Sequence, residues 1–135
     1  MKLSEAIRLG AMLHPQAIGP YVSQGPFGIR TCALGGALEA IGALEAIGYF
    51  SDRRMHPYEA AIAAFPWAST KQVRCPVDWC PDRHVQTNLL DLVAHLNDWH
   101  FWSREDIAEL VATVEAFAAS ETENAERETE IAVAV

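Results

Sequence analysis

Two cysteines and two histidines in the middle of the chain have the spacing of ligands to a metal ion. Four residues separate the cysteines, fourteen follow the second cysteine, and four separate the histidines: Cys75, Cys80, His95 and His100. Proteins bind zinc through thiolate sulfur and imidazole nitrogen, and a site with four such ligands is tetrahedral and closed to substrate. The ligand order also matches Cys2His2 fingers, in which a β-knuckle carries the cysteines and a helix carries the histidines. The sequence therefore predicts a structural Zn²⁺ site.

The interval between the two histidines limits the structure that can carry them. On a regular α-helix, positions five apart point about 140° away from each other, too far to bind one ion. A helix that carries His95 must therefore loosen or end before His100, and Asn97-Asp98 supplies residues suited to a helix end. The interval before His95 is also longer than the interval of about twelve residues in common fingers. His84, which follows Cys80 closely, is thus an alternative ligand.

The alternative to a metal site is that Cys75 and Cys80 are buried thiols or form a disulfide. Disulfides are found mainly in proteins of oxidising compartments. The chain begins Met1-Lys2-Leu3-Ser4-Glu5, without an apolar signal segment, and a third cysteine, Cys32, would stay unpaired in any disulfide scheme. We therefore expect a cytoplasmic protein with reduced cysteines.

Short elements on either side of the cysteines are predicted to hold the ligands. Residues 72–75 favour a short strand, and the apolar spacing in 87–96 is that of a helix with Thr87 as its N-cap. Leu92 lies three residues before His95, so the two side chains project from one face and the leucine lies beneath the metal. This arrangement is the Leu-x-x-His element of finger domains.

The rest of the chain is predicted to be helical, apart from a loop at 19–28 that is rich in glycine and proline. Ser4 is the expected N-cap of the first helix, Pro57 suits the first turn of the third, and Ser103 with Asp106 forms a capping box for the last. The predicted helices cover residues 4–13, 31–47, 56–65 and 103–117. We therefore expect a mainly α fold: one small helical domain over 1–119, with a short β-knuckle and a Cys2His2-type zinc site in a subregion at about 71–102.

The acidic residues of the chain are concentrated near its C-terminus. The net charge is −8 over 135 residues, and residues 101–135 alone contain nine acidic and two basic side chains. Residues 120–130 are rich in glutamate and have almost no apolar side chain, so an acidic, flexible tail is predicted for 120–135. The longest apolar stretch, at about 31–50, contains Glu39 and Glu45 and is too polar to span a membrane.

Two segments of this chain resemble a group of small, uncharacterised bacterial and phage proteins. The matching residues are Thr31-Cys32-Ala33-Leu34-Gly35-Gly36-Ala37 and the run from His95-Leu96-Asn97-Asp98 through Trp102-Ser103-Arg104-Glu105-Asp106-Ile107-Ala108. The resemblance covers about half of the chain. It implies a shared helical fold, a shared metal site through the four proposed ligands, and an accessory protein of a phage or its host. The group has no established activity and therefore implies no reaction.

Three functions are consistent with these patterns, and the first is a non-enzymatic, zinc-stapled module that binds another protein. Four aromatic residues lie close to the ligands in sequence: Trp79, Trp99, Phe101 and Trp102. They form either the packing beneath the metal or an exposed surface for a protein partner. The second function is a nucleic-acid-binding regulator. It is opposed by the small number of nearby basic residues, Lys71, Arg74 and Arg83, which are matched by Asp78, Asp82 and Asp91.

The third function is a cysteine-dependent enzyme. Cys32 follows Arg30 at the start of a predicted helix, where the helix dipole and a cation favour the thiolate, and His14, His56 or His84 would serve as its base. The alternative is that Cys32 is a small apolar residue on the packed face of an alanine-rich helix. We expect the latter, and therefore a protein without enzymatic activity.

Overall fold

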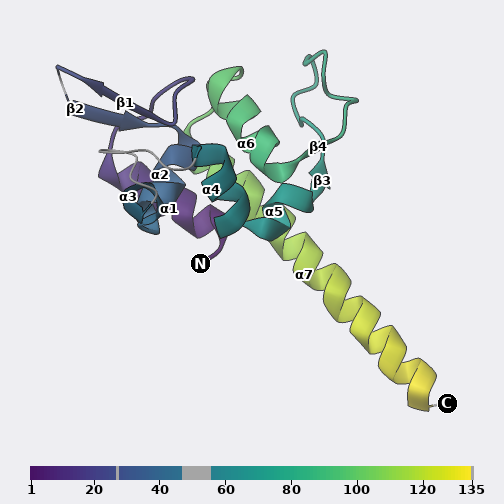
Figure 1. Cartoon of the computed structure of the whole chain (residues 1–135). Helices are drawn as coiled ribbons and strands as arrows, with labels where there is room; N and C mark the ends of the chain where they lie inside the picture. Colours follow the sequence, from purple (N-terminus) through teal and green to yellow (C-terminus); the bar gives the residue numbers. More distant parts are fainter. Residues whose placement is uncertain (27, 47–55, 135) are drawn as a thin grey trace.

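The computed structural model describes the chain except residues 27, 47–55 and 135. It confirms a mainly α fold with two small antiparallel hairpins, one of them the β-knuckle beside the cysteines (Figure 1). The helices are α1 (Leu3–Leu13), α2 (Ala33–Ala40), α3 (Ala43–Ala46), α4 (Pro57–Ala64), α5 (Pro66–Thr70), α6 (Leu89–Asp98) and α7 (Arg104–Ala134). The strands are β1 (Val22–Gly25), β2 (Gly28–Thr31), β3 (Gln72–Val73) and β4 (Thr87–Asn88).

The core is centred on α1, α2, α6 and the first turns of α7. Its largest fully buried side chains are aliphatic and come from these helices and from α3: Ile7, Leu34, Leu38, Leu44, Leu89, Leu90, Leu96 and Ile107. Helices α1 and α2 approach so closely that a Cβ added to Gly10 would lie 2.2 Å from the backbone of Gly36. Glycine is required there because any larger residue would separate the two helices.

The loop predicted at 19–28 is wrong in part, because Val22–Gly25 and Gly28–Thr31 are paired β-strands. Strands β1 and β2 pair antiparallel from Val22 opposite Thr31 to Gly25 opposite Gly28. Gly28 has a φ of +106°, a conformation that glycine adopts without strain. The glycines and prolines of this segment correctly indicated a turn. The strands have only four residues each, too few for an alternation of apolar and polar residues to reveal them.

The helix predicted over 31–47 is also different in the structure, where it is divided. Helix α2 ends at Ala40, Gly42 has a φ of +75°, and α3 follows as a single turn. Left-handed glycine is a common helix end; the predicted end at Ile47 lies outside the described residues. Lys2, not Ser4, is the N-cap of α1, and its backbone N–H donates to Glu5 Oε2 at 3.2 Å. Helix α4 agrees with its prediction, with His56 as its N-cap.

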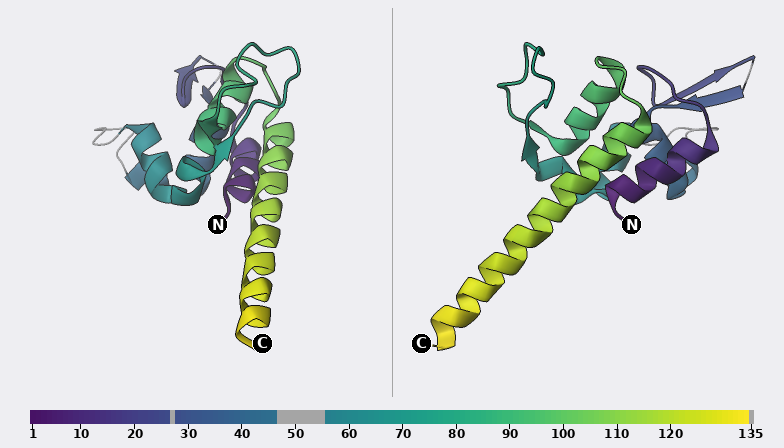
Figure 2. Two further views of the ribbon diagram at one scale, coloured as in Figure 1. Left: turned by 90° about the vertical axis from the view of Figure 1, so that its right-hand side faces the viewer. Right: turned by 180° about the vertical axis from the view of Figure 1, so that it is seen from behind.

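Helix α7 runs from the core far beyond the body of the protein (Figure 2). The sequence predicted a helix to about residue 117 and a flexible tail from 120, whereas the structure continues the helix to Ala134. Residues 104–134 contain no glycine or proline and many alanines and glutamates, which favour helix. The prediction that this segment is solvated agrees with the structure, since the side chains described from Ser120 to Ala132 are all exposed. Within the described residues, no helix is long and apolar enough to cross a membrane.

Candidate metal centre

The β3–β4 pair forms the base of the loop that carries both cysteines. Gln72 lies opposite Asn88 and Val73 opposite Thr87. The two ends of the loop 74–86 are therefore held next to each other. A short strand was predicted at 72–75; the structure has it at Gln72–Val73, paired with β4. Asn88, rather than Thr87, is the N-cap of α6, and its Oδ1 accepts a hydrogen bond from the Asp91 N–H at 2.8 Å.

Helix α6 ends between the two histidines, as the i, i+5 spacing requires. The helix covers His95 and stops at Asp98, and the Trp99 N–H donates to the His95 carbonyl at 2.9 Å. The chain then reverses through Phe101, whose φ is +54°, and the Trp102 N–H donates to the Leu96 carbonyl at 3.0 Å. A bulky residue with left-handed φ is strained. His100 lies between the end of α6 and this reversal, and its Nε2 is 3.0 Å from His95 Nε2.

The structure brings the four predicted ligands together. The sulfur and nitrogen atoms of Cys75, Cys80, His95 and His100 all lie within 4.8 Å of one another. The Cys75 Sγ to His100 Nε2 distance is 3.5 Å, as is the Cys80 Sγ to His95 Nε2 distance, and the two Nε2 atoms are 3.0 Å apart. Tetrahedral zinc with ordinary bond lengths would place sulfur and nitrogen about 3.6 Å apart, and two nitrogens about 3.3 Å apart. The group thus has the size and donor chemistry of a metal site.

Burial keeps the Cys75 thiol and the His100 imidazole uncharged while no cation is bound. Both cysteines are buried, and burial raises the pKa of Cys75, so its thiol is protonated at neutral pH without a metal. Burial and, secondly, the charge of His95 lower the pKa of His100, so its imidazole is neutral and free to donate a lone pair. A bound cation would release the thiol protons and replace the contacts between donor atoms.

A buried leucine and an exposed tryptophan lie next to the ligands. Leu92 is buried one turn before His95, as predicted, and helps to line a cavity of about 240 Å³ with Cys75 and His95. The Trp79 ring meets the His100 imidazole edge-on with the ring centroids 4.9 Å apart. In the part of the chain that the structure describes, the buried His100 Nδ1 has no hydrogen-bond partner. The position of the His100 ring therefore depends on Trp79 and on the ligand group itself.

His84, the alternative ligand, does not join this group. Its side chain is exposed on the cysteine loop, and its Nε2 accepts a hydrogen bond from Arg83 Nε at 3.2 Å. Arg83 is in turn bound through its guanidinium to the Asp78 carbonyl. Of the two ligand sets left open by the sequence, only the one with His95 and His100 is assembled within the described residues.

Sequence reasoning missed the residue that fixes α6 in place, which is Asn97. Its side chain is 1% exposed, and its Oδ1 accepts hydrogen bonds from the Ala33 N–H at 3.1 Å and from Gln16 Nε2 at 2.9 Å. Its Nδ2 donates to the Ala17 carbonyl at 2.9 Å. The Asn97 amide thus joins α6, the helix that carries His95, to the start of α2 and to the segment after α1. A signal was present in the sequence, since Asn97 lies on the apolar side of the helix with Val93.

Arg104 forms a second buried connection that the sequence did not reveal. Its guanidinium donates to the carbonyl of His14 at 2.7 Å, to that of Ala11 at 3.3 Å and to Thr31 Oγ1 at 3.3 Å. The first residue of α7 is therefore anchored to the end of α1 and to β2. Together with the Asn97–Ala33 contact, the Arg104–Thr31 contact joins residues 95–108 to residues 31–37.

Cys32 lies in a setting that keeps its thiol protonated. It is the N-cap of α2, and its Sγ accepts a hydrogen bond from the Gly35 N–H at 3.3 Å. Burial raises its pKa to about 11. Desolvation thus outweighs the helix dipole that was expected to favour the thiolate. Two proposed bases have other roles: His14 Nε2 contacts Glu39 Oε1 at 2.9 Å, and His56 Nδ1 accepts from the Tyr58 N–H.

Comparison with known proteins gives no match for this chain among protein families, curated proteins or solved structures.

Replacing Asn97 by alanine is expected to destabilise the protein by about 3 kcal/mol or more, because at least two buried backbone groups lose their partner at about 1–3 kcal/mol each. Urea unfolding followed by circular dichroism would measure this loss. The matched control is Asn124→Ala on the exposed part of α7, which should change the free energy of unfolding by less than about 0.5 kcal/mol. Equal stability of the two variants would show that the buried amide does not hold α6.

Cys32 should resist iodoacetamide at pH 8 in the folded protein, since a buried thiol with a pKa of about 11 is almost wholly protonated there. Replacing Cys75 and Cys80 by serine would leave Cys32 as the one cysteine of the sequence. That variant is unsuitable, however, because it also removes two of the proposed metal ligands. Labelling is therefore mapped by peptide mass on the metal-loaded wild type, before and after denaturation. Rapid labelling of native Cys32 would restore the hypothesis of a reactive cysteine.

Proposed function

We propose that the four-residue group binds Zn²⁺ as a closed structural site. The observation that supports this most strongly is the convergence of two thiols and two imidazoles within 4.8 Å. Two sulfur and two nitrogen donors in a tetrahedral arrangement favour zinc over the hard cations Mg²⁺ and Ca²⁺, which prefer oxygen. Four protein ligands leave no position for a substrate or an activated water. The proposed role of the metal is therefore stability and not catalysis.

Zinc would join a long loop to a helix that is already held in place. Residues 74–86 contain turns, such as the one closed by the Cys80 N–H on the Val77 carbonyl at 3.0 Å, but no strand or helix among them is assigned. Helix α6, in contrast, is buried along one face. Binding energies of structural zinc reach about 10–16 kcal/mol in finger peptides near neutral pH. Such an energy is large enough to order the loop.

The biological role that we propose is a non-enzymatic protein-interaction module, in an accessory protein of a bacterium or phage. Three aromatic side chains close to the ligands in sequence are exposed: Trp79 at 75%, Trp99 at 74% and Phe101 at 68%. Only Trp102 of the four candidates packs partly against the core. Large exposed aromatic residues are costly in water and are enriched where proteins bind other proteins. The metal would keep Trp79, on the loop, against His100, which lies between Trp99 and Phe101 in the chain.

Zinc content provides the test of the metal proposal. The purified protein should contain about one zinc per chain, and a strong chelator present during a thermal melt should lower the Tm by many degrees. Cys75→Ser and His95→Ala should each abolish stoichiometric zinc. The control is His84→Ala, which should retain it, because His84 is exposed and outside the group. Metal-free wild-type protein with an unchanged melt would contradict a structural zinc.

The proposed role of the exposed aromatics predicts a difference between two tryptophans. Trp99→Ala should leave both the zinc content and the Tm nearly unchanged, since its ring is 74% exposed. Trp102→Ala should lower the free energy of unfolding by about 2 kcal/mol, because Trp102 packs against the core. A large loss of stability in Trp99→Ala would mean that this residue is needed for folding, and the interaction surface would lose its main support.

A titration with labelled single- and double-stranded oligonucleotides distinguishes the proposed module from a nucleic-acid-binding regulator. The few basic residues near the ligands predict no saturable binding at about 150 mM salt. Binding that falls steeply with salt and is lost in Arg74→Ala would replace the protein-interaction proposal.

A further inference from the structure

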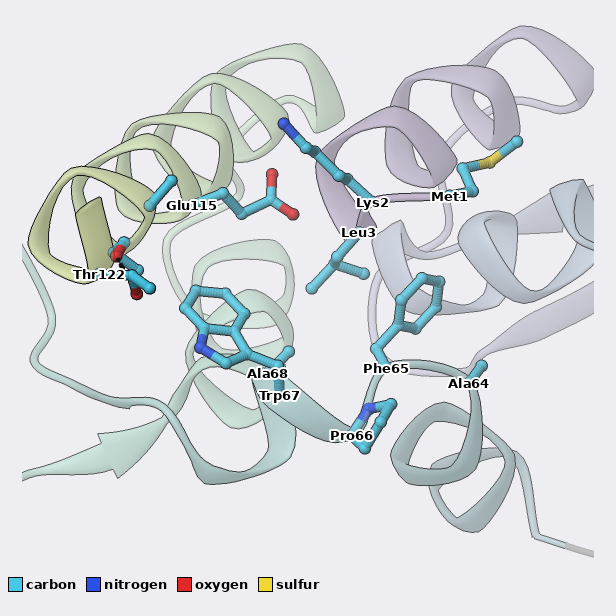
Figure 3. A pocket seen from close by; sticks show the side chains of 12 residues that line it. Met1, Lys2, Leu3, Ala64, Phe65, Pro66, Trp67, Ala68, Glu115 and Thr122 are labelled. Atoms are coloured by element: carbon cyan, nitrogen blue, oxygen red, sulfur yellow. Dashed lines mark hydrogen bonds between the residues drawn. The ribbon is translucent and has the colours of Figure 1, made fainter. Parts of the chain in front are cut away.

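A cavity of about 380 Å³ lies against the middle of α7, and none of the four candidate ligands lines it (Figure 3). Its walls come from the start of α1, from α5 with the residues before it, and from residues 115–122 of α7. The apolar lining includes Leu3, Phe65 and Trp67, whose side chains face the same space in Figure 3. Trp67 is 41% exposed, although it is one of the largest side chains of the protein. The cavity is thus an open apolar site of the size that receives one or two side chains.

A carboxylate borders this apolar site. Glu115 projects from α7 toward the space above Trp67 in Figure 3, and its Oε1 is buried without a hydrogen-bond partner among the described residues. Lys2 lines the rim, but the Glu115 oxygen forms no hydrogen bond with it. A buried carboxylate oxygen without a donor is costly, and a cation that reaches it removes that cost. The site therefore suits an apolar group that carries a positive charge.

The same face of α7 continues the site toward the C-terminus. Thr122 lines this cavity and also begins a row of exposed small and acidic side chains on one face of α7, which continues with Ala125, Glu126, Thr129 and Glu130. The hydroxyls of Thr122 and Thr129 donate to the carbonyls four residues earlier, at 3.1 and 2.9 Å, so they need no partner from outside. Small side chains with glutamates beside them form a shallow track that a second helix can approach closely. We call the cavity and this row of side chains together the α7 groove.

The charge of the groove determines which helix fits it. A second copy of the chain would bring its own α7, which also carries several glutamates and a single arginine beyond Ser120, so that like charges would meet. From the apolar cavity, the unpartnered Glu115 oxygen and the acidic track, we propose that the α7 groove binds a basic amphipathic helix of another protein. One apolar side chain of that helix enters the cavity beside Trp67, and its lysines or arginines face Glu115, Glu126 and Glu130. None of the metal ligands and none of the exposed aromatics near them takes part.

The probe for this proposal is a labelled helical peptide of leucine and lysine, with the leucines at i, i+3, i+4 and i+7 along one face. It is titrated with the full-length, zinc-loaded protein at about 150 mM salt, and binding is followed by fluorescence anisotropy. We expect saturable binding with one peptide per chain. A peptide with the same leucines and with glutamate in place of lysine should not bind.

Two pairs of variants locate the peptide on the protein. Glu126→Lys, in the groove, should weaken binding about tenfold, whereas Glu128→Lys, about 200° around the same helix, should change it less than about twofold. Ala119→Phe should fill the cavity and weaken binding about tenfold, whereas Ala116→Phe, also exposed but outside the cavity, should not. Because all four positions are exposed, the substitutions should not unfold the protein, and circular dichroism of each variant checks this. A loss of binding can then be assigned to the groove.

Three outcomes would overturn the proposal. Equal effects of the two lysine variants would mean diffuse attraction to an acidic helix, and equal binding of the glutamate peptide would remove the requirement for positive charge. Sedimentation of the protein alone as a dimer that Ala119→Phe dissociates would assign the groove to a second copy. Since the zinc content and the exposed aromatics are tested with other variants, the failure of either proposal leaves the other to stand on its own measurements.

Discussion

The position of the candidate metal centre depends on one buried amide. Asn97 lies between the two histidines in sequence, and its side chain binds the backbone of Ala33 and of Ala17, 64 and 80 residues away. A buried amide that satisfies backbone groups on two other segments fixes the helix in rotation as well as in position, because its donors and acceptors are directional. That constraint sets where α6 ends. It therefore sets the direction in which His95 and His100 point.

The two halves of the centre are consequently built in different ways. The histidine half belongs to the core, because α6 buries Leu92, Val93 and Leu96 and is anchored by Asn97. The cysteine half lies on a loop that is closed by two residue pairs between β3 and β4. A cation would thus find its nitrogen ligands positioned by packing, while its sulfur ligands arrive on a segment with little hydrogen-bonded structure. In physical terms, a bound metal would replace the hydrophobic core that this loop cannot form by itself.

Sequence reasoning succeeded where the chemistry is local and failed where it is long-range. The ligand spacing, the helix end before His100 and the leucine beneath the ligands all follow from distances of a few residues along the chain. Asn97 and Arg104 were missed because their partners are 64 to 93 residues away, and no periodicity connects them. The same limit explains the β1–β2 hairpin, whose four-residue strands are too short to show a pattern. The length of α7 was missed for another reason: acidic composition indicated disorder, although no residue in it breaks a helix.

The metal centre and the α7 groove are connected through a short stretch of backbone. Helix α5 carries Trp67, the main wall of the groove, and the Lys71 N–H donates to the Trp67 carbonyl at 2.9 Å. The Lys71 carbonyl in turn accepts the N–H of Leu89, the first residue of α6, at 3.0 Å, and β3 begins at the next residue. A loop that is ordered by a metal would therefore also restrain the end of α5. Two hydrogen bonds thus separate Trp67 from α6. Loss of the cation should therefore increase the mobility of Trp67 in the groove before it changes α1 or the distant part of α7.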